Sequence, residues 1–223
     1  LRLSPPGFER FLQTPQFVAT FGGGEANVAV CLAAFGIDSY YVTRLPKHEI
    51  GEAAMRALRA EGVRTDYILR GGDRIGVYYA EAGASQRAST VIYDRARSAI
   101  AEMEADAVDW ATVFAGAEWY HVTGITPALG EKGVAATARS LEAARAAGVR
   151  ISVDLNFRKK LWTEKQAQAI MGPLMRHVDV VIANEEDLQS VLGVHVPGTD
   201  VTSGQLDLAG FQEAAERVTR DFG

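Results

Sequence analysis

Short apolar runs alternate with longer helical patterns along most of the 223 residues. The clearest case lies in the second half, where apolar runs at 119–122 and 149–155 enclose an alanine-rich helical pattern at 131–147. Two strands that are joined through a helix run in the same direction, so this alternation favours a mostly parallel sheet covered by helices. We therefore predict an α/β fold.

The remaining elements follow the same order. Beyond the helix that the run of three glycines opens and that ends at Gly36, we expect two strands, at 39–43 and 178–182. Helices are expected at 50–61, 164–175, 185–192 and 208–221. The segment 197–204 is polar and rich in turn residues, which predicts a loop. No chemistry is assigned to it.

Two segments depart from the α/β pattern. Strands predicted at 75–80 and 89–94 flank a turn-rich stretch, and together with the N-terminal residues they favour a small antiparallel sheet. We assign 1–20 and 64–97 to this sheet and 21–63 and 98–223 to the α/β core. A sheet over the ligand end of the core would act as a lid that excludes water. The alternative, a sheet that only packs or dimerises, stays open.

Three glycines, Gly22-Gly23-Gly24, open directly into a helix of small and apolar residues. Glycine allows a ligand to approach the main chain, and the first helical turn has N–H groups without intrahelical partners. Hydroxyl or anionic oxygens fit such a junction, although a tight turn before a buried helix explains it as well. Asn27 stands where a dinucleotide-binding motif has its third glycine, and no P-loop occurs, so neither class of nucleotide-binding enzyme is indicated.

Composition excludes several classes of function. A net charge of −5 with scattered Lys and Arg does not form the basic surface of a nucleic-acid-binding protein. No run reaches the roughly 18 apolar residues of a membrane span, and no signal-peptide pattern opens the sequence. We expect a cytoplasmic protein without nucleic-acid or membrane partners. The single cysteine, Cys31, excludes an intramolecular disulfide, and we expect it to pack in the core.

Polar residues follow three predicted strands, at the edge where ligands bind in open parallel sheets. Gly124 follows the first of these strands, at 119–122. The second strand leads into the run Asp154-Leu155-Asn156-Phe157-Arg158. A guanidinium binds carboxylate or phosphate through two hydrogen bonds, so Arg158 is a candidate for an anionic ligand. The alternative for Arg158 is a surface ion pair.

Asn184 with the three acids Glu185, Glu186 and Asp187 follows the third strand. These oxygens are suited to a hydrated magnesium ion, while helix capping is the simpler explanation. In the lid, Tyr78, Tyr93 and Arg95 are candidates for gripping a hydroxylated acid, although tyrosines there also serve packing. Tyr79 takes the place of Tyr78 if the register of the hairpin differs.

The run Gly22-Gly23-Gly24-Glu25-Ala26-Asn27-Val28-Ala29 resembles the first signature of the ribokinase-like, or PfkB-type, sugar kinases. Similarity to the ketodeoxygluconate kinases of this family rests on the runs 124–129, 154–162 and Tyr93-Asp94-Arg95. The resemblance implies a three-layer α/β/α fold with a mostly parallel central sheet and a small antiparallel lid. It also implies ATP- and Mg²⁺-dependent phosphorylation of 2-keto-3-deoxygluconate, with a fructokinase, another neutral-sugar kinase or a non-catalytic sugar-binding protein as alternatives.

Carried over residue by residue, the resemblance implies three groups of site residues. The sugar would be bound by Gly23, Gly24, Asn27, Tyr78, Tyr93, Arg95, Ile125 and Arg158. The nucleotide phosphates would be bound by Asn156, Arg158 and Asn184. Glu186 and Asp187 would act on magnesium through water, and the reach of Asp187 is in question because the family motif has Glu there.

The family's catalytic base lies in a Gly-Ala-Gly-Asp motif, which does not occur before Gly223. We therefore expect the base and the adenine pocket beyond Gly223, in a parent chain of about 300 residues, a length typical of larger α/β domains. The 223 residues alone are expected not to catalyse. The resemblance also implies a homo-oligomer that forms through the lid.

Overall fold

The computed structural model describes residues 1–196 and 208–222. The chain divides into two compact units, Leu1–Met103 and Glu104–Gly223, which are described separately below. The polar loop expected at 197–204 lies outside the described residues. Among those residues, every helix is too short or too polar to cross a membrane.

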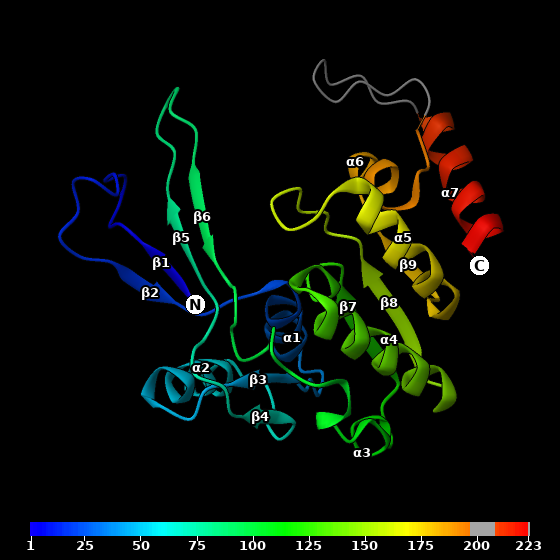
Figure 1. Ribbon diagram of the computed structural model, residues 1–223, viewed down its shortest axis with the longest axis horizontal. Coiled ribbons are helices and arrows are strands. Elements are labelled where there is room, and N and C mark those ends of the chain that lie inside the picture. Colours follow the sequence, from blue (N-terminus) through cyan, green and yellow to red (C-terminus); the bar gives the residue numbers. More distant parts are fainter. Residues whose placement is uncertain (197–207, 223) are drawn as a thin grey trace. The chain divides into compact units, whose positions relative to one another are not determined.

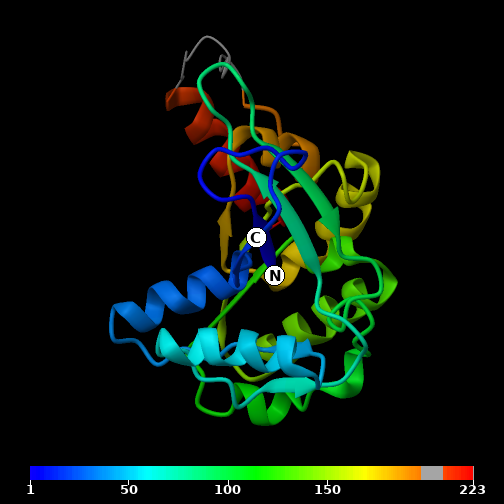
Figure 2. The same ribbon diagram turned by 90° about the vertical axis from the view of Figure 1, so that its left-hand side faces the viewer.

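A four-stranded sheet with the order β2-β1-β5-β6 occupies one part of the first unit. Its strands are β1 (Arg2–Ser4), β2 (Val18–Thr20), β5 (Val77–Glu81) and β6 (Thr90–Asp94), with β5 and β6 forming a long arm (Figures 1 and 2). The β1–β2 and β5–β6 pairings are antiparallel as expected, but β1 pairs with β5 in parallel. The small antiparallel sheet that the sequence indicated is therefore present, with one parallel pairing that the hairpin signals did not indicate, because hairpin turns fix only the partners that are adjacent in sequence.

The rest of the first unit has the expected α/β order. It contains α1 (Gly24–Ala34), β3 (Thr43–Leu45), α2 (Glu49–Ala60) and β4 (Ile68–Arg70), and β3 and β4 are parallel. Their core is built from apolar side chains, including Ala26, Ala29, Leu45, Met55, Leu58 and Ile68. The expected strand at 39–43 is wrong: Tyr40 forms only an isolated bridge to Arg64. The preceding Ser39 is buried, and its hydroxyl donates a hydrogen bond to the Ala29 carbonyl of α1.

The environment of Cys31 also corrects an expectation. Helix α1 buries Ala26 and Ala29, whereas Cys31 is exposed. Two positions along a helix correspond to roughly 200° of rotation, so Cys31 and Ala29 lie on different faces. An almost uniformly apolar sequence did not show which face of this helix turns inward.

The second unit is built on a parallel sheet with the order β7-β8-β9 (Figure 1). The strands are β7 (Trp119–Thr123), β8 (Arg150–Asp154) and β9 (Val180–Ile182). The α-helices are α3 (Trp110–Phe114), α4 (Glu131–Ala146), α5 (Glu164–Leu174), α6 (Glu185–Asp187) and α7 (Leu208–Phe222). Short 3-10 turns occupy Ala105–Ala107, Pro127–Leu129 and Met175–His177. The parallel strands of this unit and the small four-stranded sheet of the first unit agree with the α/β, ribokinase-like class that the sequence indicated.

The helix expected at 185–192 differs in its detail. It begins as the single α-helical turn α6 and continues as a π-helical segment, Leu188–Leu192, which ends at Gly193. Gly193 has φ 68°, a left-handed conformation that favours glycine. The wider π turn is not encoded by any spacing of apolar residues, so the sequence pattern did not distinguish it from an α-helix.

Candidate functional site

The junction before α1 presents bare backbone at Gly23. This residue has extended backbone, with φ 173°, which any amino acid adopts. A Cβ added to Gly23 would meet only the Ala26 Cβ at 3.8 Å, an ordinary contact. Neither the conformation nor the packing of the described residues therefore requires glycine here. An approaching ligand would require it, since a side chain would occupy the space in front of the main chain.

Asn27 lies one helical turn after Gly23 and is exposed. Its Oδ1 accepts a hydrogen bond from the Gly23 N–H over 3.4 Å, which is long and leaves that N–H weakly bound. The Asn27 side chain offers both donors and acceptors, and the first-turn N–H groups of a helix have no intrahelical acceptor. This combination suits the hydroxyl groups of a sugar.

The β5–β6 arm brings Tyr78, Tyr93 and Arg95 together. Tyr78 lies directly opposite Tyr93 in the β5–β6 register, with ring centroids 6.2 Å apart. The Arg95 Cζ lies 4.4 Å from the centroid of the Tyr93 ring and 6.0 Å from that of Tyr78. All three side chains are half-buried. Stacking on aromatic rings orients the planar guanidinium, which remains suited to a carboxylate.

The same register answers the question about Tyr79. Tyr79 lies opposite Ile92, and its ring packs against Phe17 with centroids 5.9 Å apart. Successive strand residues point to opposite faces, so Tyr79 lies on the face away from Tyr78 and Tyr93. Tyr78 is thus the tyrosine that accompanies Arg95.

In the second unit, hydrogen bonds join the carboxyl ends of the three parallel strands. The Gly124 N–H donates to the Asp154 carbonyl over 2.8 Å, and the Leu155 N–H donates to the Ile182 carbonyl over 3.0 Å. A Cβ at Gly124 would lie 2.2 Å from the Leu155 carbonyl oxygen. Gly124 is therefore explained by packing between the strand ends. The adjacent Ile125 is half-buried, and its N–H donates to the Thr123 hydroxyl over 3.2 Å.

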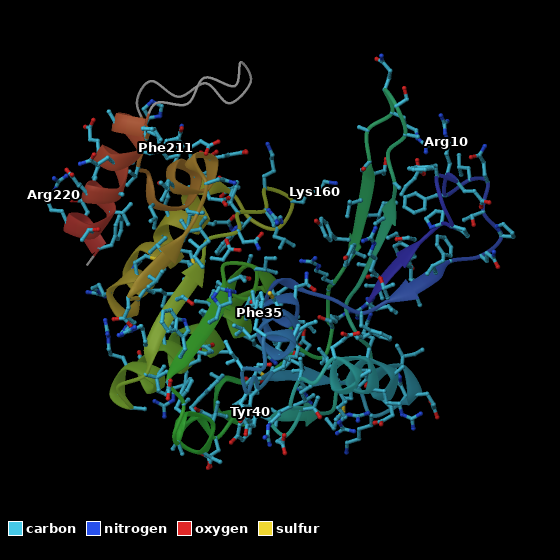
Figure 3. The ribbon with its side chains drawn as sticks, turned by 180° about the vertical axis from the view of Figure 1, so that it is seen from behind. Arg10, Phe35, Tyr40, Lys160, Phe211 and Arg220 are labelled. Atoms are coloured by element: carbon cyan, nitrogen blue, oxygen red, sulfur yellow. The ribbon has the colours of Figure 1, made fainter. Side chains whose placement is uncertain are left out.

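Asn156 and Arg158 lie on the segment that follows β8, which also carries Lys160, the residue labelled in Figure 3. Asn156 has φ 42°, and its Oδ1 is buried without a hydrogen-bond partner. Arg158 is exposed, and its Nη1 donates to the Phe157 carbonyl over 2.8 Å. Within the described ranges, no carboxylate forms an ion pair with Arg158. The surface ion pair considered as the alternative is thus not found there, although burial raises the pKa of Asp187 and the positive charge of Arg158 acts to lower it.

Asn184 does cap a helix, as the simpler explanation held. Its Oδ1 accepts a hydrogen bond from the Asp187 N–H over 2.7 Å. The Asp187 carboxylate is 9 % exposed and accepts a hydrogen bond from the Phe157 N–H over 3.0 Å. Burial raises the pKa of Asp187, and that hydrogen bond opposes the rise. Asp187 therefore braces the segment carrying Asn156 and Arg158, a role that the sequence gave no signal for.

The acids near Asn184 fit magnesium only through water. In the part of the chain that the structure describes, no three His, Cys, Asp or Glu side chains gather as metal ligands. Glu186 is 68 % exposed and lies 3.8 Å from the Lys159 Nζ, whereas Asp187 is turned inward. A hydrated Mg²⁺ needs only one or two carboxylates and keeps several waters. Glu186 is the carboxylate that is accessible for such an ion.

A cavity of about 450 Å³ lies elsewhere in the second unit, beside α7. Its lining is mainly apolar, with side chains such as Met175, Val181, Phe211, Ala215 and Phe222. None of the predicted site residues contributes to it. The predicted residues instead group around the start of α1 and on the β5–β6 arm in the first unit, and at the carboxyl ends of β7, β8 and β9 in the second.

Known proteins similar to this chain carry sugar-kinase names. Residues 7–212 match the model of the pfkB family carbohydrate kinases. A 2-dehydro-3-deoxygalactonokinase of Haloferax volcanii is 36% identical over 195 residues, which cover 86% of this chain and 60% of that protein. A fructokinase of Klebsiella pneumoniae is 30% identical over 229 residues, covering 98% and 67%.

A solved structure is more similar still. The crystal structure of 2-dehydro-3-deoxygluconokinase from Thermotoga maritima is 49% identical to this chain, with a TM-score of 0.94. The match covers 100% of this chain and 66% of that one. The chain thus spans about two thirds of the length of these relatives.

Proposed function

Since the chain belongs to the pfkB family of carbohydrate kinases, we propose that the full-length protein transfers the γ-phosphoryl group of ATP to 2-keto-3-deoxygluconate, also called 2-dehydro-3-deoxygluconate. The acceptor is its terminal hydroxyl, so the product is the 6-phosphate. Relatives named for this substrate and for its galactonate counterpart support the proposal. ATP as the donor makes the cytoplasm the proposed location.

The observation that carries the choice of substrate is the position of Arg95 over the rings of Tyr78 and Tyr93. A ketodeoxy sugar acid has a carboxylate at one end, which a guanidinium binds through two hydrogen bonds. The two phenol hydroxyls supply further hydrogen bonds. A neutral sugar such as fructose has no group that requires a cation.

We assign the following steps to residues of this chain. The backbone of Gly23 and Gly24 and the side chain of Asn27 hold sugar hydroxyls, and Arg158 binds the substrate and the phosphate undergoing transfer. Asn156 and Asn184 bind the nucleotide phosphates, and Glu186 orients a hydrated Mg²⁺. Bound ATP and Mg²⁺ supply the phosphoryl group and neutralise its charge.

In the transfer itself, the C6 hydroxyl oxygen forms a bond to the γ-phosphorus while the bond from that phosphorus to the bridging oxygen breaks. The hydroxyl proton passes to a carboxylate that we expect beyond Gly223. Positioning and charge neutralisation account for most of the catalysis of such reactions. The described residues therefore hold the acceptor and the phosphates but do not supply the base.

A substrate panel tests the proposal on the full-length protein. ADP formation with ATP and Mg²⁺ is measured for 2-keto-3-deoxygluconate, 2-keto-3-deoxygalactonate, fructose and ribose. We expect kcat/KM for a ketodeoxy acid to exceed that for fructose by at least about 100-fold, as the half-buried guanidinium of Arg95 allows. Equal or better turnover of fructose would establish the fructokinase alternative. Binding of the acid without ADP formation would establish a non-catalytic sugar-binding protein.

Arg158 is tested by replacement with glutamine. Because its guanidinium bonds only to the Phe157 carbonyl among the described residues, we expect Arg158→Gln to change the free energy of unfolding by about 0.5 kcal/mol or less. Activity with the acid should fall at least about 100-fold. Arg176→Gln is the matched control, since Arg176 is also exposed and donates to a nearby carbonyl, that of Pro173. A collapse of stability in Arg158→Gln would assign it a structural role instead.

We further propose that two copies of the chain pair through the lid face opposite to Tyr78 and Tyr93. On that face Phe17 and Ile92 are 42% and 52% exposed. The segment 5–17, which carries Arg10 in Figure 3, is fixed by a hydrogen bond from the Phe11 N–H to the buried carboxylate of Glu81. This segment also exposes Phe8 and Leu12. A second copy would cover this apolar surface and the open edge of β2.

Sedimentation of the full-length protein tests this pairing. We expect a dimer that Ile92→Glu converts to a monomer while the fold is retained. Ile50→Glu on α2 is the matched control, because Ile50 is 46% exposed but lies outside the lid. A monomeric wild-type protein, or an Ile92→Glu variant that stays dimeric, refutes the proposal.

A further inference from the structure

Arg74 lies outside all the predicted site residues, yet it binds the segment that carries Arg95. Its Nη1 donates to the Asp94 Oδ1 over 2.8 Å and to the Ala96 carbonyl over 3.2 Å. Its Nη2 donates to the Asp94 Oδ2 and to the Asp94 carbonyl. One guanidinium therefore holds the main chain on both sides of Arg95.

Two segments connect the β5–β6 arm with the rest of its unit, one before β5 and one after β6, and their backbones are hydrogen-bonded to each other. The Ala99 N–H donates to the Arg74 carbonyl over 2.8 Å. A Cβ on Gly72 would lie 2.9 Å from Ala99, so the two segments approach too closely for a side chain at that position. Arg74 and Asp94 are the charged side chains that fasten this connection, just where β5 begins and β6 ends.

Successive side chains of a strand point to opposite faces, which places the ring of Tyr93 and the carboxylate of Asp94 on different sides of β6. Tyr93 lies on one face of β6, and the Cζ of Arg95, the residue after the strand, lies 4.4 Å from the centroid of its ring. Asp94 points to the other face, where Arg74 binds its carboxylate. Arg74 thus contacts the two neighbours of Arg95, Asp94 and Ala96, from the face opposite to the Tyr93 ring. Its own side chain and that of Asp94 are 35% and 47% exposed, so the pair adds little to global stability and mainly fixes geometry.

We propose that Arg74 is a positioning residue for acid recognition: by clamping Asp94 and Ala96, it keeps the Arg95 guanidinium stacked on Tyr93 in the orientation that receives a carboxylate. This role rests on the proposed function of the site. A displacement of about 1 Å in a binding group lowers activity up to about 100-fold, so loss of the clamp affects the acid substrate selectively.

The kinetic test uses Arg74→Gln, Arg74→Lys and Asp94→Asn in the full-length protein. We expect Arg74→Gln to raise KM for the ketodeoxy acid about tenfold or more, with kcat, KM for ATP and the unfolding midpoint nearly unchanged. Arg74→Lys keeps the charge but lacks the planar fork, so its KM should be intermediate. Adding Asp94→Asn to Arg74→Gln should have no further effect, because both remove one interaction. Arg64→Gln, which breaks an exposed pair with Asp38 in the same unit, is the matched control.

A second readout does not depend on activity. Protons of a guanidinium that lies over an aromatic ring resonate upfield, so the Arg95 side-chain NMR signals report stacking on Tyr93 directly. We expect the upfield displacement in wild type and Arg64→Gln, and its loss in Arg74→Gln. An unchanged Arg95 signal in Arg74→Gln, or an unchanged KM for the acid with the clamp removed, overturns the positioning role. If the wild-type enzyme instead prefers a neutral sugar, the proposed function fails while the NMR result still decides whether Arg74 positions Arg95.

Discussion

The Phe157 N–H donates a hydrogen bond to the Asp187 carboxylate over 3.0 Å, which ties the segment after β8 to the helix after β9. Asp187 is buried at the start of that helix, where Asn184 caps its N–H. The neighbouring Glu186 is exposed. Two adjacent acids thus have different tasks: one supports the loop that carries Asn156 and Arg158, and the other is accessible to ligands.

Removing the Asp187 acceptor is expected to destabilise the fold. Asp187→Ala leaves the buried Phe157 N–H without a partner, so the free energy of unfolding should fall by about 1.5–3 kcal/mol. Asp187→Asn retains an oxygen acceptor and should lose clearly less. Denaturant unfolding of the two variants measures the difference, and equal losses would show that the charge, rather than the hydrogen bond, is what matters.

Glu186→Gln should alter magnesium dependence without altering stability. Its carboxylate is exposed and pairs only distantly with Lys159, so unfolding should change by about 0.5 kcal/mol or less. The Mg²⁺ concentration for half-maximal activity should rise about tenfold, the scale found when groups around a metal site are removed. Glu185→Gln serves as control. An unchanged Mg²⁺ requirement would exclude Glu186 from the magnesium site.

Two glycine substitutions distinguish a glycine that leaves space for a ligand from one that is required by packing. In Gly23→Ala the added Cβ makes only an ordinary contact, so stability should change by about 1 kcal/mol or less, while KM for the sugar rises about tenfold. In Gly124→Ala the Cβ would lie 2.2 Å from the Leu155 carbonyl oxygen, which should cost about 1–3 kcal/mol of stability. Unfolding curves and sugar titrations of both variants check this contrast. A destabilised Gly23→Ala with normal KM would assign Gly23 to packing.

Asp179 should make stability depend on pH in the acid range. Its Oδ2 accepts a hydrogen bond from the Ile151 N–H over 2.7 Å and its Oδ1 one from Arg145 over 2.9 Å. These interactions, led by the Ile151 N–H, hold the pKa of Asp179 below 3.8. Because the folded pKa lies below the unfolded one, the stabilisation is present above pH 3.8 and is lost as the pH falls through the folded value.

The variant Asp179→Asn tests this dependence. Its unfolding midpoint should be lower than that of the wild type at pH 7, and the two midpoints should converge as the pH falls below 3.8. Asp38→Asn, at an exposed pair with Arg64, should show little difference at either pH. A gap between Asp179→Asn and wild type that stays constant with pH would contradict this account.

The sequence by itself predicted most of the order of elements and the parallel strands, and it named the candidate site residues, whose roles stay predictions. Periodicity and turn residues are local properties, so they predict strands such as Trp119–Thr123 and helices such as Glu131–Ala146 nearly to the residue. The resemblance of the glycine junction and of the run after β8 to known motifs supplied the family, which the comparison with known proteins confirmed.

Tertiary structure alone decided relationships between residues far apart in the chain. The parallel pairing of β1 with β5, the exposed face that carries Cys31, the register that selects Tyr78 over Tyr79 and the burial of Asp187 all depend on partners contributed by other segments. The clamp of Arg74 on Asp94 spans 20 residues and follows no motif. Such contacts arise because packing chooses among partners that local sequence leaves equivalent, which is why the sequence named the candidate residues and the fold showed what holds them in place.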